Sequence, residues 1–333
     1  MLRLVRVLLI LAALWSLYWF AAAYGLRSSV SNWFAAREAE GWQADYADLA
    51  TSGFPLRHLT TLTAPALADP ATGTAWRADW LTFDSPAIWP GRQTLRFADT
   101  PQRLSYFDQT AVIEAQGMSA ELHLAPGVAL ELERMALTSG PWALRQEGGP
   151  LAEAQSLTLE MVQTDDAPTY RIAASAEAFT PGDGLRRMLR PTSALPRSFE
   201  TAQAEMTVTF DKPWDRTALE ERRPQPQAVD LRLAELHWGE LRLFATGSLS
   251  IDEQGIPTGE VAIKAENWRE MLAMAQAAGA LPPQAVEPAA RVLGMLAGLG
   301  GNPKALDAQL NFREGFVALG PIPLGPAPRF ILR

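Results

Sequence analysis

Cysteine is absent from this sequence of 333 residues. Its absence excludes thiol catalysis, thiolate metal sites, disulfide bonds and the lipid-modified cysteine that anchors bacterial lipoproteins. A chain of this length buries enough apolar surface to fold without such cross-links. Any attachment to a membrane must therefore be made by a segment of the polypeptide itself.

Lysine is rare, and acidic residues outnumber basic ones. The lysines are Lys212, Lys264 and Lys304, the formal net charge is −8, and the isoelectric point is about 5.1. Proteins that bind nucleic acids present clustered Lys and Arg side chains to the phosphate backbone. The composition therefore predicts no nucleic-acid partner.

Familiar catalytic motifs are also missing. The sequence lacks the G-x-S-x-G, P-loop and H-E-x-x-H patterns. Its three histidines, His58, His123 and His237, are far apart and have no carboxylate or second histidine at the spacing of metal ligands. We expect core or surface histidines, and a protein that is not an enzyme and needs no metal or cofactor.

An uncharged apolar run extends from Val7 to Tyr24. Its length of about 18 residues, at 1.5 Å per residue, suits the roughly 30 Å of bilayer hydrocarbon. Arg3 and Arg6 precede the run, so the positive-inside rule predicts a cytoplasmic N-terminus and a periplasmic location for the rest of the chain. The residues expected to anchor this single helix in a bacterial inner membrane, with an interfacial belt of aromatic rings, are Leu8, Leu11, Leu14, Trp15, Tyr18 and Trp19.

A cleaved signal peptide is the alternative for this segment. Ala21 to Ala23 offer an A-x-A cleavage site, and cleavage there would release the chain into the periplasm. Against cleavage, apolar residues continue at helical spacing at Leu26, Val30 and Phe34. The sequence favours a transmembrane helix and amphipathic stalk over residues 1–40, followed by a periplasmic β-rich domain over 41–333.

Beyond Gly41 the pattern changes to alternating apolar and polar residues separated by turns. It predicts a mainly β (α+β) fold, in which the N-terminal helix leads into a long curved antiparallel sheet with a few packed helices near the C-terminus. The clearest predicted elements are hairpins over 118–132 and 241–263 and helices over 183–190, 267–280 and 283–299. The proline-containing segment 220–227 is a candidate boundary within the sheet.

One face of the 241–263 hairpin is continuously apolar. Its residues are Leu241, Leu243, Leu249, Ile251, Val261 and Ile263. Two interpretations stay open: these side chains line an exposed groove that accepts acyl chains, or they form core beneath the C-terminal helices. An apolar sheet face needs a cover, and a sheet tethered beside a bilayer has lipid close by.

Several short motifs resemble a bacterial envelope family, that of domain of unknown function 2125. They are Gly41-Trp42, Gly53-Phe54-Pro55, Ala68-Asp69-Pro70, Trp76, Trp89-Pro90 and the stretch from Leu319 to Gly325. A weaker resemblance, over Leu241 to Trp268, is to AsmA-type envelope proteins, which implies an inner-membrane helix followed by a curved sheet with an open hydrophobic groove. Neither resemblance implies a catalytic residue.

These features predict a non-enzymatic inner-membrane protein whose periplasmic sheet binds or transfers phospholipid or acyl chains in envelope maintenance. The alternative is a structural or assembly factor that binds another envelope protein by adding a strand to a sheet edge. Lipid retained after gentle purification favours the first hypothesis, and a co-purifying protein without lipid favours the second.

Overall fold

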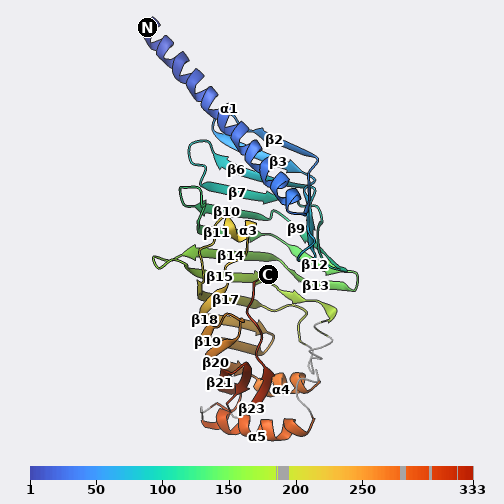
Figure 1. Cartoon of the computed structure of the whole chain (residues 1–333). Helices are drawn as coiled ribbons and strands as arrows, with labels where there is room; N and C mark the ends of the chain where they lie inside the picture. The colour runs from blue at the N-terminus through green and yellow to red at the C-terminus, as the bar shows by residue number, and fades with distance from the viewer. Residues whose placement is uncertain (185, 187–194, 278–282, 300–301, 321, 333) are drawn as a thin grey trace.

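A long N-terminal helix leads into two antiparallel β-sheets (Figure 1). This computed structural model describes residues 1–184, 186, 195–277, 283–299, 302–320 and 322–332. The mainly β fold, the apolar N-terminal helix and the helices near the C-terminus expected from the sequence are confirmed. The strands, however, divide into two sheets, where the sequence pattern predicts a single curved one.

The helices lie near the two ends of the chain and in one connection. Those described are α1 (Leu2–Ala39), α3 (Thr217–Glu220), α4 (Trp268–Ala277) and α5 (Pro283–Leu299). The predicted transmembrane run and stalk form one unbroken helix, α1. By length and composition α1 can cross a membrane, which is compatible with an anchor or a signal sequence. The helix predicted over 183–190 lies largely outside the described residues.

The smaller sheet consists of short strands arranged in chain order. Within the described residues these are β1 (Gln43–Asp45), β4 (Ala66–Asp69), β5 (Thr74–Arg77), β8 (Gln102–Tyr106), β9 (Gln109–Ala115), β12 (Trp142–Gln146), β13 (Gly149–Ala154) and β16 (Thr180–Pro181). Each is antiparallel to its neighbours.

The larger sheet also follows chain order. Within the described residues its strands are β2 (Asp48–Ser52), β3 (Arg57–Thr63), β6 (Trp80–Pro86), β7 (Arg92–Phe97), β10 (Ser119–Leu124), β11 (Leu132–Ser139), β14 (Ser156–Gln163), β15 (Thr169–Glu177), β17 (Thr201–Phe210), β18 (Pro226–Trp238), β19 (Leu241–Ile251), β20 (Pro257–Glu266), β21 (Ala305–Arg313), β22 (Phe316–Leu319) and β23 (Ile322–Pro326). β19 has the limits that the apolar alternation predicts.

The chain passes back and forth between the two sheets. β7 leads into β8, β9 into β10, β11 into β12, β13 into β14 and β15 into β16, so many strands of one sheet continue a strand of the other. Small buried side chains occupy the crossings, where Ala98, Ala115, Ser139 and Ala154 are at most 6% exposed. Interiors are close-packed, so there is little room where two sheets meet. The hairpins up to β16 are therefore long, bent and shared by both sheets, whereas β17 to β23 belong to the larger sheet alone.

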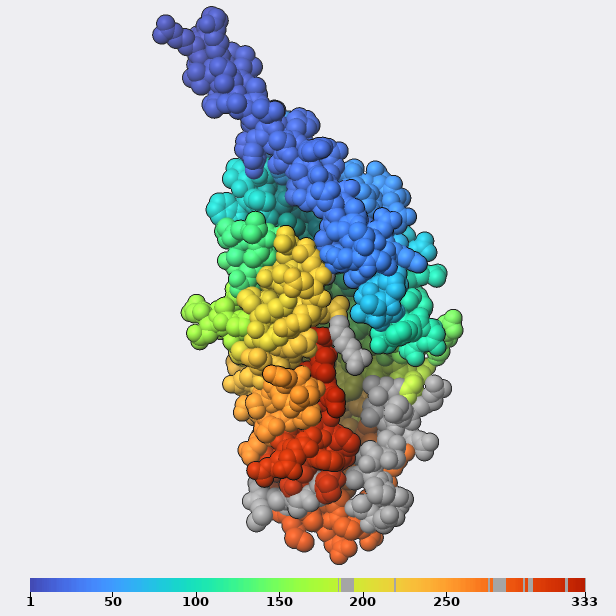
Figure 2. All heavy atoms as spheres, viewed as in Figure 1, coloured from blue at the N-terminus to red at the C-terminus, as the bar shows by residue number. Residues whose placement is uncertain are grey.

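Segments distant in sequence cover one face of the larger sheet (Figure 2). α1 contacts β1, β2 and β3 at one end. Next comes the β17–β18 connection, residues 211–225, whose Trp214 ring packs edge-on against Phe210 at 5.6 Å. The C-terminal residues follow, with the Phe330 N–H donating to the Gly255 carbonyl oxygen, and then α4 and α5. Along much of its length this face is therefore buried against other parts of the chain.

Two features of the connections differ from the sequence patterns. A strand is predicted over 128–132, but residues 125–131 form a loop and β11 begins at Leu132. Leu130 in that loop has a φ of 53°, a left-handed conformation that interrupts a strand. The candidate boundary at 220–227 lies in and just after the β17–β18 connection, and β17 pairs with β18, so the larger sheet continues across it.

Asp211 ties together the two ends of the β17–β18 connection. Its carboxylate accepts the backbone N–H of Gln225 at 2.8 Å and the Arg222 guanidinium at 2.6 Å. Desolvation raises the pKa of Asp211, but these donors outweigh it and lower the pKa below its ordinary value of 3.8. The charged carboxylate therefore stabilises the fold above the unfolded-state pKa, and this stabilisation is lost as pH falls through the folded-state pKa.

Asp211→Asn is expected to lower the free energy of unfolding by about 1–3 kcal/mol near pH 7, because Arg222 loses a charged acceptor. Denaturant unfolding between about pH 7 and pH 2 tests this, and the difference from the native chain should shrink at the acidic end. Asp230→Asn, at an exposed position of β18, is the matched control. A difference that stays constant with pH contradicts the assignment.

Candidate functional site

Two aromatic side chains of α1 are hydrogen-bonded to hairpin loops of the larger sheet. The Trp15 indole N–H donates to the Pro55 carbonyl oxygen at 3.0 Å, in the β2–β3 loop. The Tyr18 hydroxyl donates to the Ala87 carbonyl oxygen at 2.7 Å, in the β6–β7 loop. The middle of α1 is thus attached to the rim of the domain at two separate loops.

Trp19 makes the most extensive of these contacts. Its indole N–H donates to the Arg57 carbonyl oxygen at 2.9 Å, and the ring is only 3% exposed. The ring stacks on His58, with centroids 4.9 Å apart, and meets Phe54 edge-on at 5.5 Å. His58 is therefore a buried packing residue, one of the two roles predicted for the histidines.

The six predicted anchor residues separate into two groups. Leu8, Leu11 and Leu14 are exposed. Trp15, Tyr18 and Trp19 instead contact the domain, although the sequence pattern assigns them to an interfacial belt in lipid. The polar atoms of indole and phenol rings require acceptors when buried, and here loop carbonyl groups supply them.

A cavity of about 410 Å³ lies between α1 and the larger sheet, beside these contacts. One side of α1, the strands β3, β6 and β7, and the β6–β7 and β10–β11 loops form its wall. The lining residues are Leu26, Ser29, Val30, His58, Thr60, Phe83, Ser85, Pro90, Gly91, Gln93, Ala125, Pro126, Gly127 and Leu130. The wall is mostly apolar, and the volume is within the usual range of small-molecule sites.

Gly91 allows the two loops of this wall to meet. The Leu124 N–H donates to the Gly91 carbonyl oxygen at 2.8 Å, which joins the β6–β7 loop to the end of β10. A Cβ atom at Gly91 would lie 2.7 Å from the Leu124 carbonyl oxygen, so a larger residue forces the loops apart. The close approach therefore requires glycine at this position.

The charged groups of this region lie on the opposite face of the sheet. His58 pairs with Ser85 in the β3–β6 register, so the neighbouring Asp84 points away from the cavity. The buried Asp84 carboxylate accepts from the Arg57 guanidinium at 2.6 Å, and Arg96 lies 3.6 Å from its other oxygen. The hydrogen bond to Asp84 raises the pKa of Arg57, which stays charged. The cavity is thus free of ion pairs.

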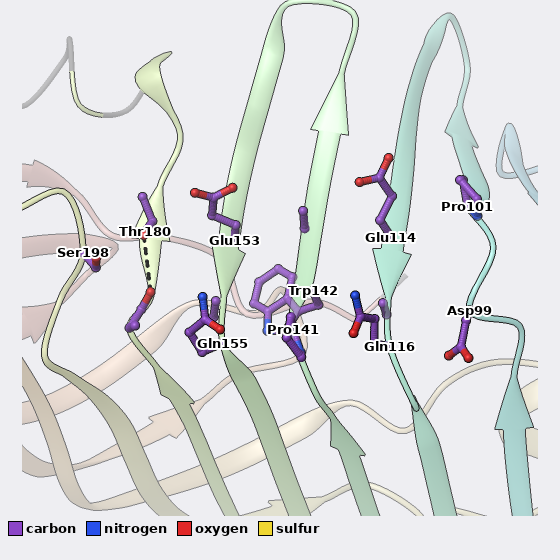
Figure 3. Close-up of a pocket in the computed structure, with 14 residues that line it drawn as sticks. Asp99, Pro101, Glu114, Gln116, Pro141, Trp142, Glu153, Gln155, Thr180 and Ser198 are labelled. Atoms are coloured by element: carbon purple, nitrogen blue, oxygen red, sulfur yellow. Dashed lines mark hydrogen bonds between the residues drawn. The ribbon is translucent and has the colours of Figure 1, made fainter.

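A second cavity, of about 600 Å³, lies where the strands cross between the sheets (Figure 3). Its labelled lining is mostly polar, and two of its three carboxylates have structural partners. Asp99 accepts the Gly117 N–H at 2.7 Å, and Glu114 pairs with Arg145 at 3.2 Å. Within the described part of the chain, no three His, Asp or Glu side chains are grouped to hold a metal ion. Of the two cavities, the one beneath α1 suits an apolar ligand.

The sequence matches a family model described as an uncharacterized protein conserved in bacteria, domain of unknown function 2125, over residues 19–328. The chain belongs to this family. The match includes every residue that lines the cavity beneath α1, and it confirms the resemblance carried by the short motifs. No curated protein matches the chain. The likeness of this family member to AsmA-type proteins stays a prediction.

In this member of the domain of unknown function 2125 family, the predicted groove residues lie on the covered face of the larger sheet. Leu241 packs with Trp238 and Met274, and Leu243 and Ile263 pack against the cluster beneath α4 and α5. Leu241 is therefore buried core, whereas Leu243 and Ile263 are partly buried beneath the C-terminal helices. Of the others, Ile251 and Val261 are buried and Leu249 is half-buried.

Sequence reasoning did not identify the cavity beneath α1. Leu26 and Val30 stand out only as apolar positions of the stalk, Pro90 only in the Trp89-Pro90 motif, and Pro126-Gly127 only as a turn. The sequence signal that could have indicated the cavity is the row of apolar residues along one side of the stalk helix, because such a row requires a surface to pack against. Which strands supply that surface depends on the strand order.

Proposed function

We propose that this protein is anchored in the bacterial inner membrane by α1 and binds an acyl chain of a phospholipid in the cavity beneath it, as a non-enzymatic protein of the cell envelope. The observation that carries the proposal is an apolar cavity walled by the same helix that is apolar enough to span a bilayer. Arg3 and Arg6 favour a cytoplasmic N-terminus, which puts the β-domain in the periplasm.

The energetics suit reversible binding. Transferring a methylene group from water to an apolar environment is favourable by about 0.8 kcal/mol. An acyl chain that moves from the bilayer into the cavity leaves one apolar environment for another, so the exchange changes the free energy little. Leu26, Val30 and Phe83 supply the apolar wall. The protein is thus suited to hold a lipid and release it.

Filling the cavity tests the proposal. Val30→Trp places a large ring in the cavity and is expected to lower the phospholipid bound per chain at least several-fold. The matched control is Ala35→Trp, at an exposed position on the same helix, which should retain lipid. Native mass spectrometry and lipid extraction of the full-length protein, purified in mild detergent, measure the bound lipid.

The outcomes separate cleanly. Stoichiometric phospholipid in the native chain and in Ala35→Trp, but not in Val30→Trp, supports the cavity as the site. Equal lipid in both variants contradicts it. If only Leu249→Asp loses lipid while its circular dichroism spectrum matches that of the native chain, the lipid binds instead in the predicted groove further along the sheet.

The C-terminal edge of the larger sheet gives less support to strand addition. In the described residues β23 is the last strand of the larger sheet, and it pairs with β22 on one side only. It contains Pro323 and Pro326, which have no N–H to donate to an added strand. Prolines at an edge oppose pairing with another chain. Lipid binding is therefore the function that we propose.

A further inference from the structure

Two hairpin loops of the larger sheet expose large apolar side chains beside α1. In the β2–β3 loop Phe54 is 49% exposed and Leu56 73%, and in the β6–β7 loop Ile88 is 70% and Trp89 60% exposed. Neighbouring loops that both expose large apolar groups mark an interaction surface, whereas single exposed residues need no explanation.

This loop surface continues onto α1. The Phe54 ring stacks on Phe20 with centroids 5.8 Å apart, and Phe20 and Leu17 are themselves exposed. The loops are fixed to the helix by the hydrogen bonds from Trp15 and Tyr18 to Pro55 and Ala87. The loops and this part of the helix therefore form one apolar surface.

The attachment point lies well inside the apolar run of the helix. Trp15 precedes the end of that run at Tyr24 by nine residues, or about 13 Å along the axis at 1.5 Å per residue. If the run from Val7 to Tyr24 spans the hydrocarbon, the loops bound to Trp15 and Tyr18 lie below its periplasmic boundary. Side chains at that depth must be apolar, and those of the two loops are.

We infer that the β2–β3 and β6–β7 loops insert into the periplasmic leaflet of the bilayer that α1 spans, so that the domain contacts the membrane through its own surface. The inference rests on the anchor part of the proposed function and is independent of whether the cavity holds lipid. Inserted loops next to the cavity give an acyl chain a path that avoids water, because the β6–β7 loop also lines the cavity.

The composition of successive loops supports this orientation. The hairpin loops of the larger sheet follow one another along one edge that begins beside α1 (Figure 1). The loops nearest α1 are apolar, whereas the more distant β14–β15 loop carries Asp165 and Asp166. Arg92 begins the strand that follows the β6–β7 loop and is exposed, so its long cationic side chain can reach lipid phosphate groups.

The absence of cysteine makes a direct test available, because any introduced cysteine is unique. The full-length chain carrying Ile88→Cys, labelled with an environment-sensitive fluorophore, is reconstituted into vesicles of phosphatidylethanolamine and phosphatidylglycerol. We expect quenching by nitroxide groups on the lipid acyl chains and protection from aqueous iodide. Leu56→Cys is the second test position. Leu8→Cys is the control inside the membrane, and Asp165→Cys is the control in water.

Each outcome decides the inference. Quenching of the Ile88 and Leu56 labels by lipid nitroxide, as at Leu8, establishes insertion. If the Leu8 label is quenched by lipid but Ile88 and Leu56 respond to iodide as Asp165 does, the loops lie in water and the inference is overturned, while the anchor stands. If the Leu8 label also responds to iodide, both the loop insertion and the membrane anchor are overturned. The lipid content of Val30→Trp then tests the cavity independently.

Discussion

Replacing Trp19 with alanine is expected to release α1 from the larger sheet. The ring is buried against His58 and Phe54, and its N–H is bonded to the Arg57 carbonyl oxygen. Losing a buried tryptophan costs about 3–5 kcal/mol. Because roughly 1.4 kcal/mol is a tenfold change in an equilibrium, amides of the stalk should exchange with deuterium at least a hundredfold faster. Hydrogen exchange of the full-length protein in lipid nanodiscs measures this.

Two further substitutions show whether the effect belongs to the Trp19 contact. Trp19→Phe keeps most of the ring and removes the hydrogen bond, so its effect should be near 1 kcal/mol. Leu17→Ala, at an exposed position two residues away, should change exchange little. Equal exchange in Trp19→Ala and Leu17→Ala shows that the helix is held by other contacts. Because α1 forms one wall of the cavity, release should also reduce bound lipid.

Tyr170→Ala is expected to lower the free energy of unfolding by about 3–5 kcal/mol. Tyr170 is fully buried in the centre of the larger sheet, in a cluster with Met161, Val208 and Phe210. Its hydroxyl oxygen also accepts the backbone N–H of Trp214 at 3.1 Å, which holds the β17–β18 connection on the sheet. Denaturant unfolding, followed by circular dichroism, measures the loss.

The hydroxyl contribution can be measured on its own. Tyr170→Phe keeps the ring and leaves the Trp214 N–H without this acceptor, at a cost of about 1–2 kcal/mol. Tyr106→Phe, at an exposed tyrosine of the smaller sheet, is the matched control and should be neutral. If Tyr170→Phe is also neutral, the connection is held by packing of the Trp214 ring rather than by this bond.

The strand content could be read from the sequence because alternation is a local property. The limits of β19 follow from six apolar positions at every second residue from Leu241 to Ile251, with mostly polar neighbours opposite. The continuous α1 likewise follows from apolar spacing through Leu26 and Phe34. In each case the face that packs is set by residues within one element.

The division into two sheets could not be read in the same way. The crossings are marked only by small residues such as Ala115 and Ala154, which are common in this alanine-rich chain and have no local signature. Similarly, the alternation at Val128 and Leu130 favours a strand, but β11 starts only at Leu132, after the left-handed turn at Leu130. Tertiary packing decides both cases.

The cavity was missed for a related reason. Apolar positions in β19 and β20 point to the far end of the sheet, where α4 and α5 cover Leu243 and Ile263. The residues that line the cavity beneath α1 come from one helix, three strands and two loops, and the strand order brings them together. The aromatic rings of α1 gave a signal, but indole and phenol groups suit a lipid interface and a protein contact equally well.

The bent hairpins give this architecture a modular length. Because the hairpins between β3 and β16 cross from one sheet to the other, inserting or deleting one of them changes both sheets by two strands at once. With neighbouring strands about 4.8 Å apart, each such step alters the length of the body by roughly 10 Å. A chain with more or fewer such hairpins would thus extend a greater or smaller distance from α1 while keeping the same helix contact.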